Sequence, residues 1–143
     1  MLRDGVTVEI ASDLDQVQVL GLYRAVGWIA YTEQPDVLQA ALAGSSRIVV
    51  AREGGALIGL ARVISDGASI AYLQDVLVHP RHQRRGLGAA LVRSALEPYA
   101  EVRQKVLLTD DQPAQQAFYE HLGYQEISKT ASGSLRAFVR FDR

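Results

Sequence analysis

The residues best suited to chemistry in this chain are three arginines and two glycines gathered in one short segment. Arg81, Arg84 and Arg85 supply cationic donors that suit phosphate oxygens. Gly86 and Gly88 have no Cβ, so a ligand can approach the backbone closely there. Apolar, strand-like residues precede the segment and a helical pattern follows it. The first turn of that helix would present unpaired N–H groups and the positive end of its dipole. The spacing predicts an anion site that fits a pyrophosphate.

The segment does not match two more specific nucleotide-binding motifs. One alternative without a ligand remains. Gly86-Leu87-Gly88 resembles a dinucleotide-binding turn, but Leu91 stands where that fingerprint needs a small residue. No Lys-Ser/Thr pair follows the glycines, which excludes the loop of nucleoside-triphosphate hydrolases. The remaining alternative is a solvated run of charges that caps an ordinary helix.

The elements that must position this loop follow from periodicity, capping residues and turn signals. Alternation with period two predicts strands, and apolar residues three to four apart predict helices. In chain order we expect a strand at Val6–Ile10, a helix capped by Ser12 or Asp13 and ending near Gly27, a helix from Pro35 to Gly44, strands at Arg47–Ala51, Leu57–Ile64 and Ser69–Val78, a helix from Gly86 to about Ala100, a strand at Lys105–Leu108, a helix at Pro113–Leu122 and two final strands. This order predicts an α/β fold, a mixed sheet with helices on its faces, in one domain over residues 1–143.

Composition narrows the classes of protein further. The 143 residues are 48% hydrophobic, which is enough for a core. The 15 Lys and Arg residues are balanced by 16 Asp and Glu residues, so no basic excess points to nucleic acid. The sequence has no cysteine, no apolar run long enough for a membrane span and no signal-peptide pattern at its start. We expect a cytoplasmic protein with neither a nucleic-acid nor a membrane partner.

Two motifs together resemble one enzyme family. Gln83-Arg84-Arg85-Gly86-Leu87-Gly88 matches the Gln/Arg-x-x-Gly-x-Gly/Ala signature of the GNAT superfamily of N-acetyltransferases, and Val76–Pro80 is similar to the strand and turn that precede it. Ala117–Tyr124 resembles the later helix of that superfamily. The resemblance covers about residues 5 to 140. It implies the acyl-CoA N-acyltransferase fold of a small bacterial-type member, with acetyl-CoA as co-substrate and no metal.

The resemblance assigns acetyl-CoA to two stretches. The strand before the loop would splay from its neighbour and pair its backbone with the pantetheine arm, a role that falls on Val76, Leu77 and Val78. The pyrophosphate would lie over the backbone amides of the loop and the first helical turn, with help from arginine side chains. Those residues are Gln83, Arg84, Arg85, Gly86, Leu87, Gly88 and Ala89.

Tyr119 matches the tyrosine that protonates the departing thiolate in many relatives. A phenol suits this task because it keeps its proton at neutral pH and a helix can aim it. The alternative is a core aromatic, since Phe118 and Tyr119 share an apolar helix. The chain departs from the family at Gln112, where relatives often carry an asparagine that holds the cofactor.

Asp75 is the expected general base, because it is the one acidic residue in Ser69–Val78 and relatives often use a carboxylate on this strand. The alternative is a structural aspartate that holds a turn or a neighbouring arginine. Other candidates for the base are His79, Asp66 and Glu33, and Tyr72 or Gln74 would suit a water-orienting role.

The expected reaction is direct attack of a primary amine on the thioester. Trp28 and Tyr31 would form an aromatic wall for a small amine, and Glu33 would attract its ammonium group. Residues 65–78 show a weak likeness to arylalkylamine (serotonin-type) N-acetyltransferases. A protein lysine or N-terminal acetyltransferase and a non-catalytic acyl-CoA sensor remain alternatives. The alternating segment Leu135–Phe141 would suit a homodimer formed through edge strands.

Overall fold

The computed structural model describes residues 2–130 and 134–142, which fall into two compact units. The first unit extends to Leu108 and the second begins at Thr109. The single-domain organisation stays a prediction.

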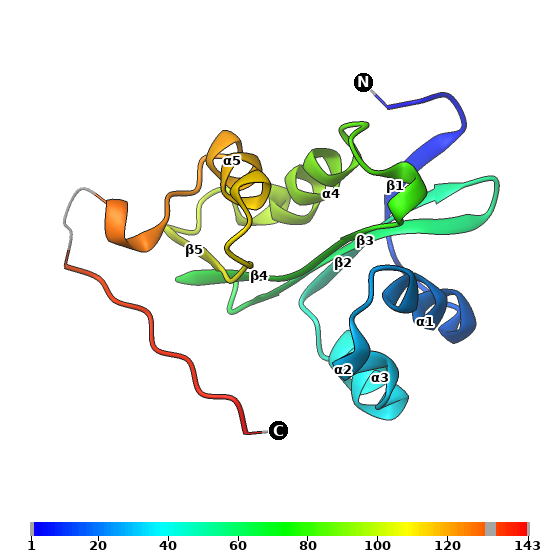
Figure 1. Ribbon diagram of the computed structural model, residues 1–143, viewed down its shortest axis with the longest axis horizontal. Helices are drawn as coiled ribbons and strands as arrows, with labels where there is room; N and C mark the ends of the chain where they lie inside the picture. Colours follow the sequence, from blue (N-terminus) through cyan, green and yellow to red (C-terminus); the bar gives the residue numbers. More distant parts are fainter. Residues whose placement is uncertain (1, 131–133, 143) are drawn as a thin grey trace. The chain divides into compact units, whose positions relative to one another are not determined.

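The first unit is built on a five-stranded mixed sheet with the order β1-β2-β3-β4-β5 (Figure 1). β1 to β4 pair antiparallel, and β5 pairs parallel to β4. The strands are β1 (Val6–Ile10), β2 (Arg47–Glu53), β3 (Ala56–Ser65), β4 (Ile70–Val78) and β5 (Gln104–Leu107). The predicted mixed α/β fold is confirmed.

Two turns connect the central strands for identifiable reasons. Gly54 and Gly55 join β2 to β3 with φ angles of 56° and 85°, and this left-handed pair is favoured in two-residue hairpins. At the β3–β4 turn, the Asp66 carboxylate accepts hydrogen bonds from the backbone N–H groups of Ala68, Ser69 and Ile70. These turns bring β4 back beside β3, so its far end reaches the arginine-rich loop.

Helices cover both faces of the sheet (Figure 1). One face carries α1 (Gln16–Ala25), α2 (Ile29–Thr32) and α3 (Pro35–Ala43), and the other carries α4 (Leu87–Leu96), which continues into a 3₁₀ turn at Glu97–Tyr99. Pro35 begins α3 as expected. The residue that caps α1 is Asp15, not Ser12 or Asp13, because its carboxylate accepts from the amides of Val17 and Gln18. α2 was not predicted, since four residues are too few to show a helical period.

The core lies mainly between the sheet and the α1–α3 layer. It contains Val19, Leu22, Tyr23, Leu38, Val50, Leu57, Leu60 and Leu77. On the other face, α4 buries Leu87, Leu91, Val92 and Ala95. At Gly59 a Cβ would lie 2.8 Å from Leu91 Cδ1 and 3.2 Å from the Leu77 carbonyl oxygen, so α4 packs tightly on β3.

The second unit contains α5 (Pro113–His121) and a 3₁₀ turn at Ile127–Lys129. Gly123 follows α5 with a φ of 95°, consistent with its predicted role as the helix stop. The two final strands were predicted wrongly for the described residues, because 124–130 and 134–142 contain no strand. Alternation makes a segment compatible with a strand, but a strand also needs a paired neighbour. Without one, Phe138 and Phe141 remain 94% and 87% exposed.

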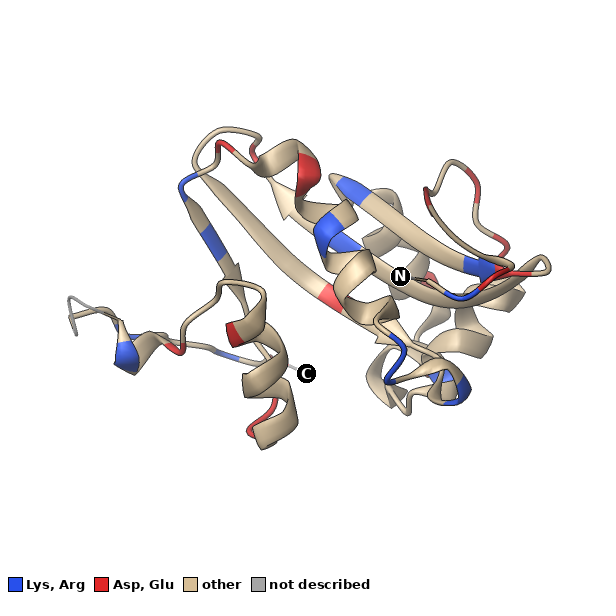
Figure 2. Cartoon of the chain, turned by 90° about the horizontal axis from the view of Figure 1, so that it is seen from above, with Lys and Arg blue, Asp and Glu red and all other residues tan. Residues whose placement is uncertain are grey.

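Charged residues of both signs are interspersed over the elements (Figure 2). In the described part of the chain, no helix has both the length and the apolar character needed to cross a membrane.

Candidate active site

The loop between β4 and α4 presents an unbroken row of backbone donors. After a 3₁₀ turn at Pro80–His82, Arg84 adopts a φ of 64° and Gly86, the N-cap of α4, a φ of 77°. Within the described residues, the N–H groups from Gln83 to Ala89 donate to no protein acceptor. Left-handed residues in such a loop turn successive N–H groups toward a common point, which forms an anion-binding nest. The helix start adds the positive end of its dipole.

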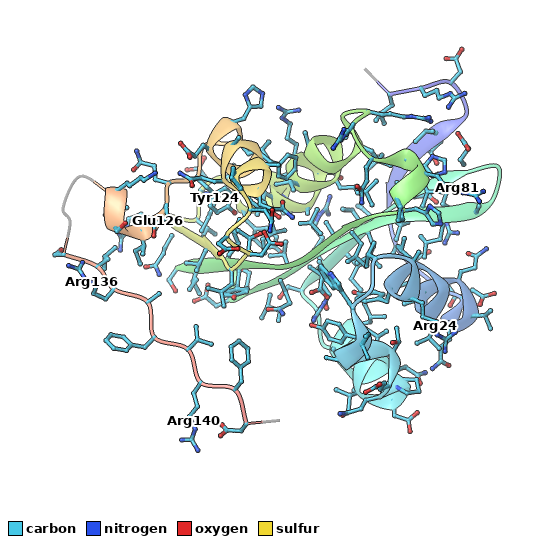
Figure 3. All side chains as sticks on the ribbon, in the orientation of Figure 1. Arg24, Arg81, Tyr124, Glu126, Arg136 and Arg140 are labelled. Atoms are coloured by element: carbon cyan, nitrogen blue, oxygen red, sulfur yellow. The ribbon has the colours of Figure 1, made fainter. Side chains whose placement is uncertain are left out.

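The side chains of this loop are arranged around that nest. Arg84 and Arg85 are exposed, so their guanidinium groups are accessible to a ligand. The Gln83 side chain turns back and donates to the Val78 carbonyl oxygen at 3.0 Å, which ties the loop to the end of β4. Arg81 lies within the 3₁₀ turn (Figure 3).

β4 has an open edge immediately before the loop. Its parallel pairing with β5 covers Ile70 to Leu73 and goes no further among the described residues. From Gln74 to Val78 the strand continues beside β3 alone. The backbone groups that point away from β3 along this stretch have no strand partner in the first unit. An extended chain bearing amide groups could pair there as an added strand.

A register shift lies at the start of this open edge. Asp75 pairs with Arg62 and Leu73 pairs with Val63, so Gln74 has no partner on β3. An extra residue of this kind bends the strand and re-aims neighbouring side chains. Here the unpaired Gln74 directly follows Leu73, the last residue of β4 that pairs with β5.

Asp75 is buried beneath this point in a network of hydrogen bonds. Its Oδ2 accepts from Arg62 Nε at 2.6 Å and from the Tyr23 hydroxyl at 2.9 Å, and its Oδ1 accepts from the Tyr31 hydroxyl at 3.4 Å. Arg62 and Asp75 are 3% and 2% exposed. Burial lowers the pKa of Arg62, but the hydrogen bond and charge of Asp75 outweigh that effect and raise it. Burial, reinforced by Asp75, also raises the pKa of Tyr23 far above its usual value.

The aromatic residues expected at the acceptor site form a cluster beside the network. Trp28 and Tyr31 both pack near Tyr23, with ring centroids 5.9 and 5.3 Å away, and they lie 6.3 Å from each other. Both are half-buried and contact the core. Glu33 is exposed at the C-terminal end of α2.

Tyr119 belongs to α5 in the second unit. Its ring lies 4.9 Å from Phe118 and 6.0 Å from Tyr124, both in edge-to-face geometry. Burial, with a smaller contribution from the charge of Asp110, raises the pKa of Tyr119 to about 12. The Tyr124 hydroxyl is buried without a hydrogen-bond partner in the described residues. Gln112 is the N-cap of α5, with no side-chain capping bond.

Comparison with known proteins settles the family. Residues 44–126 match the model of the acetyltransferase (GNAT) domain. The chain belongs to the GNAT acetyltransferase family. A GNAT-family acetyltransferase from Streptococcus pneumoniae shares 30% identity with it and superposes with a TM-score of 0.83, covering 96% of this chain and 98% of that one. An aminoglycoside N-acetyltransferase solved in complex with CoA shares 17% identity at a TM-score of 0.68, covering 96% and 95%, and so shows a common fold.

Curated relatives of this GNAT chain are longer proteins. The chloroplastic GCN5-related N-acetyltransferase 2 of Arabidopsis thaliana is 32% identical over 87% of this chain and 57% of its own length. A mycothiol acetyltransferase of Saccharopolyspora erythraea is 41% identical over 53% of this chain and 26% of its own length. The chain therefore spans a quarter to just over half of these two proteins.

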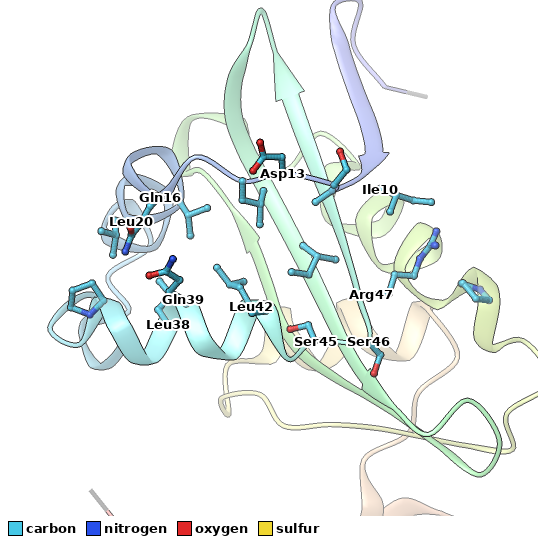
Figure 4. Close-up of a pocket in the computed structure, with 18 of the residues that line it drawn as sticks. Ile10, Asp13, Gln16, Leu20, Leu38, Gln39, Leu42, Ser45, Ser46 and Arg47 are labelled. Carbon is cyan, nitrogen blue, oxygen red and sulfur yellow. The ribbon is translucent and has the colours of Figure 1, made fainter.

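Two cavities of the GNAT chain are not lined by the open-edge residues 74–78. One of about 600 Å³ lies between α1, α3 and the β1–β2 edge, where Asp13, Gln39 and Arg47 line it (Figure 4). The other, of about 450 Å³, is lined by His79, Arg81 and residues of α1 and β3. The Nδ1 of His79 accepts from the Arg81 amide, so His79 faces this cavity with that nitrogen already engaged. Neither cavity is lined by Trp28, Tyr31 or Glu33.

Sequence reasoning missed Arg62 and Tyr23, the residues that hold Asp75. Arg62 lies in a mostly apolar strand and Tyr23 in a helix with apolar and polar residues, and neither position by itself indicates a contact with Asp75. Only the pairing register places Arg62 opposite Asp75. A basic residue in the middle of an otherwise apolar central strand was the one available signal.

Proposed function

We propose that this chain is an acetyl-CoA-dependent N-acetyltransferase that moves the acetyl group to a primary amine by direct attack. One observation carries the proposal: a nest of free backbone N–H groups follows directly on a strand whose edge is open. The nest suits the pyrophosphate, and the open edge from Val76 to Val78 suits the amide-bearing pantetheine arm. Acetyl-CoA combines these two chemistries in one extended molecule.

The proposed roles follow from this placement. The amides from Gln83 to Ala89 bind the pyrophosphate, with Arg84 and Arg85 adding charge. The amine attacks the thioester carbon while a backbone amide of β4 stabilises the developing oxyanion. Tyr119 gives its proton to the departing thiolate, a role that its pKa of about 12 supports because the phenol stays protonated at neutral pH.

The acceptor is proposed to be a small amine. The half-buried aromatic pair of Trp28 and Tyr31 supports an apolar or arylalkyl body, while exposed Glu33 would meet the ammonium group only from outside. For Asp75, the ion pair with Arg62 favours the structural alternative over the base role, since most of its lone pairs are engaged. We keep the cytoplasm as the proposed compartment and the homodimer as the proposed assembly.

Calorimetric titration with acetyl-CoA tests the proposal, with NAD and ATP as controls. Wild type should bind acetyl-CoA and neither control ligand. Gly86→Glu should abolish binding, because a carboxylate would lie among the N–H groups that face the phosphates. Gly5→Glu is the matched control, because Gly5 also has a positive φ and open space at its Cβ position but lies before β1. Equal loss of affinity in the two variants would refute the loop assignment.

A further inference from the structure

Three side chains of β4 share one face of the sheet because of the register shift. Arg62 and Val63 are consecutive on β3 and face opposite sides, so their partners Asp75 and Leu73 do so too. Tyr72 pairs with Ile64, which lies on the same side as Arg62. The side chain of Gln74 also reaches this side, since its Nε2 donates to the Tyr31 hydroxyl at 3.3 Å. Tyr72, Gln74 and Asp75 therefore lie together on the α1–α3 side.

The Tyr31 hydroxyl at the centre of this group has no capacity left for a ligand. It accepts from Arg62 Nη2 at 3.1 Å and from Gln74 Nε2, and it donates to Asp75 Oδ1. A hydroxyl offers one donor and two acceptor sites, and all three are used. The hydrogen bond from Gln74 to Tyr31 therefore holds the Gln74 carboxamide in one orientation.

The carboxamide oxygen of Gln74 is the group left available. It accepts no hydrogen bond in the described part of the chain. Gln74 is half-buried, and of the described half-buried and buried side chains only Tyr124 has a polar atom that is both shielded from solvent and unpartnered. Gln74 Oε1 is therefore accessible. It lies at the residue where β5 leaves the edge of β4 and the open stretch begins.

We infer that Gln74 binds the acceptor amine, with an amine N–H donating to Gln74 Oε1, and that Arg62, Asp75 and Tyr31 are positioning residues behind it. This inference rests on the proposed function. An amide oxygen accepts a hydrogen bond without taking the proton, so Gln74 orients the nitrogen lone pair toward the thioester carbon. The C–N bond forms, the C–S bond breaks, and the proton lost by nitrogen is matched by the one gained by sulfur. Amine and acetyl thioester become amide and thiol.

The inference also limits the acceptor. The Arg62–Asp75 pair cancels its own charge, and Gln74, Tyr31 and Tyr72 are neutral, so this face offers uncharged hydrogen-bonding groups, the Gln74 carboxamide oxygen and the Tyr72 hydroxyl, beside aromatic rings. That chemistry selects a monoamine on an apolar or aromatic body over an amine with several charges.

Steady-state kinetics of the full chain with tyramine, tryptamine and a lysine-containing peptide test this assignment. Gln74→Ala should raise the KM for the best of these amines about tenfold, the loss of one hydrogen bond, and leave the acetyl-CoA dissociation constant within about twofold. Tyr31→Phe should have a similar effect, and the double variant should lose little more, because both act through one carboxamide. Gln39→Ala, at an exposed position of α3, is the matched control and should match wild type. Thermal unfolding confirms that each variant is folded.

The outcomes separate the inference from the function on which it rests. An unchanged amine KM in Gln74→Ala, or additive losses in the double variant, overturns the role of Gln74 while leaving the acetyltransferase intact. A rise in the acetyl-CoA dissociation constant with no change in amine KM also overturns it. If wild type acetylates none of the amines, the proposed function fails and the inference falls with it. Faster turnover of the peptide than of both arylalkylamines overturns the limit on the acceptor.

Discussion

At the scale of single residues, the Arg62–Asp75 ion pair differs from the other ion pairs because both of its side chains are buried. The side chains of Arg62 and Asp75 are 4% and 2% exposed, whereas those of Arg52 and Glu9, also an ion pair, are 23% and 54% exposed. Removing one member of a buried pair leaves an uncompensated charge in the interior, and this costs more than the pair itself contributes.

Arg62→Ala should therefore lower the free energy of unfolding by about 3 to 5 kcal/mol. Arg52→Ala, the control, should cost about 1 kcal/mol or less, because water solvates the partner that remains. Urea unfolding at neutral pH measures both. A double change, Arg62→Met with Asp75→Leu, should recover most of the loss. Similar losses in Arg62→Ala and Arg52→Ala would contradict the importance of burial here.

The two tyrosines of the second unit allow a matched test of the proposed acid. Tyr119→Phe should lower kcat about 10²-fold while the acetyl-CoA dissociation constant stays the same. Tyr124→Phe removes a neighbouring buried hydroxyl that has no partner among the described residues, so it should leave kcat unchanged and slightly raise stability. The reverse pattern would transfer the acid role to Tyr124.

The pH dependence of kcat checks the same role independently. A phenol acts as an acid only while protonated, and burial holds the pKa of Tyr119 at about 12. The alkaline limb of the wild-type profile should therefore begin above about pH 11 and not near the ordinary tyrosine value of about 10. A decline centred near pH 10 that Tyr119→Phe does not alter would show that another group limits the rate.

At the scale of elements, the β3–β4 turn depends on one carboxylate. Hydrogen bonds from the Ser69 hydroxyl and from the amides of Ala68, Ser69 and Ile70 hold the pKa of Asp66 well below its usual range. A depressed pKa stabilises the fold above the unfolded-state pKa, and this stabilisation is lost as the pH falls below about 4.

Asp66→Ala should therefore lower the free energy of unfolding at pH 7, and the gap from wild type should narrow as the pH falls from about 4 to 2. Denaturant titrations at several pH values measure this gap. Asp13→Ala is the control, because the exposed Asp13 carboxylate accepts no hydrogen bond among the described residues. A gap that stays constant with pH would show that Asp66 acts through its backbone conformation and not through its charge.

The elements of the first unit were largely predictable because each carries a local signal. Alternation marked β1, apolar runs bounded by turn signals marked β2 to β4, Pro35 marked the start of α3, and Gly54-Gly55 marked a hairpin. The arginine-rich loop was found for the same reason, since its donors are adjacent in the chain. The register shift at Gln74 has no local signal, because it depends on how β3 and β4 pair. The contacts that Arg62 and Tyr23 make with Asp75 join distant parts of the chain, so they could not be predicted from the sequence.

In the C-terminal part, a local signal was present but the predicted strand is not formed. Leu135 to Phe141 alternates as well as β1 does, but its described residues form no strand. A period-two pattern specifies which faces would be apolar, and pairing depends on a neighbour that lies elsewhere in the chain. The pattern was therefore sufficient for β1, which pairs with β2, and insufficient here.

At the scale of the whole molecule, the proposed reaction needs both units, because the phosphate loop and β4 belong to the first and Tyr119 to the second. If the chain is one domain, the two units should unfold together. Trp28 is the one tryptophan of the chain, so its fluorescence reports the first unit alone. Exchange of the α5 amide hydrogens reports the second. In urea, the two signals should give the same midpoint and the same free energy of unfolding.

Adding acetyl-CoA gives a second test of whether the two units unfold together. A ligand that binds only the folded state at about 100 times its dissociation constant stabilises that state by about 2.7 kcal/mol. In a single domain, both the Trp28 signal and the α5 exchange signal should gain this amount. Gly86→Glu should gain nothing in either signal, which controls for effects of the ligand on urea or on exchange chemistry. A gain confined to Trp28, with α5 exchanging at lower urea, would show that the second unit unfolds independently and that residues 1–143 are not one cooperative domain.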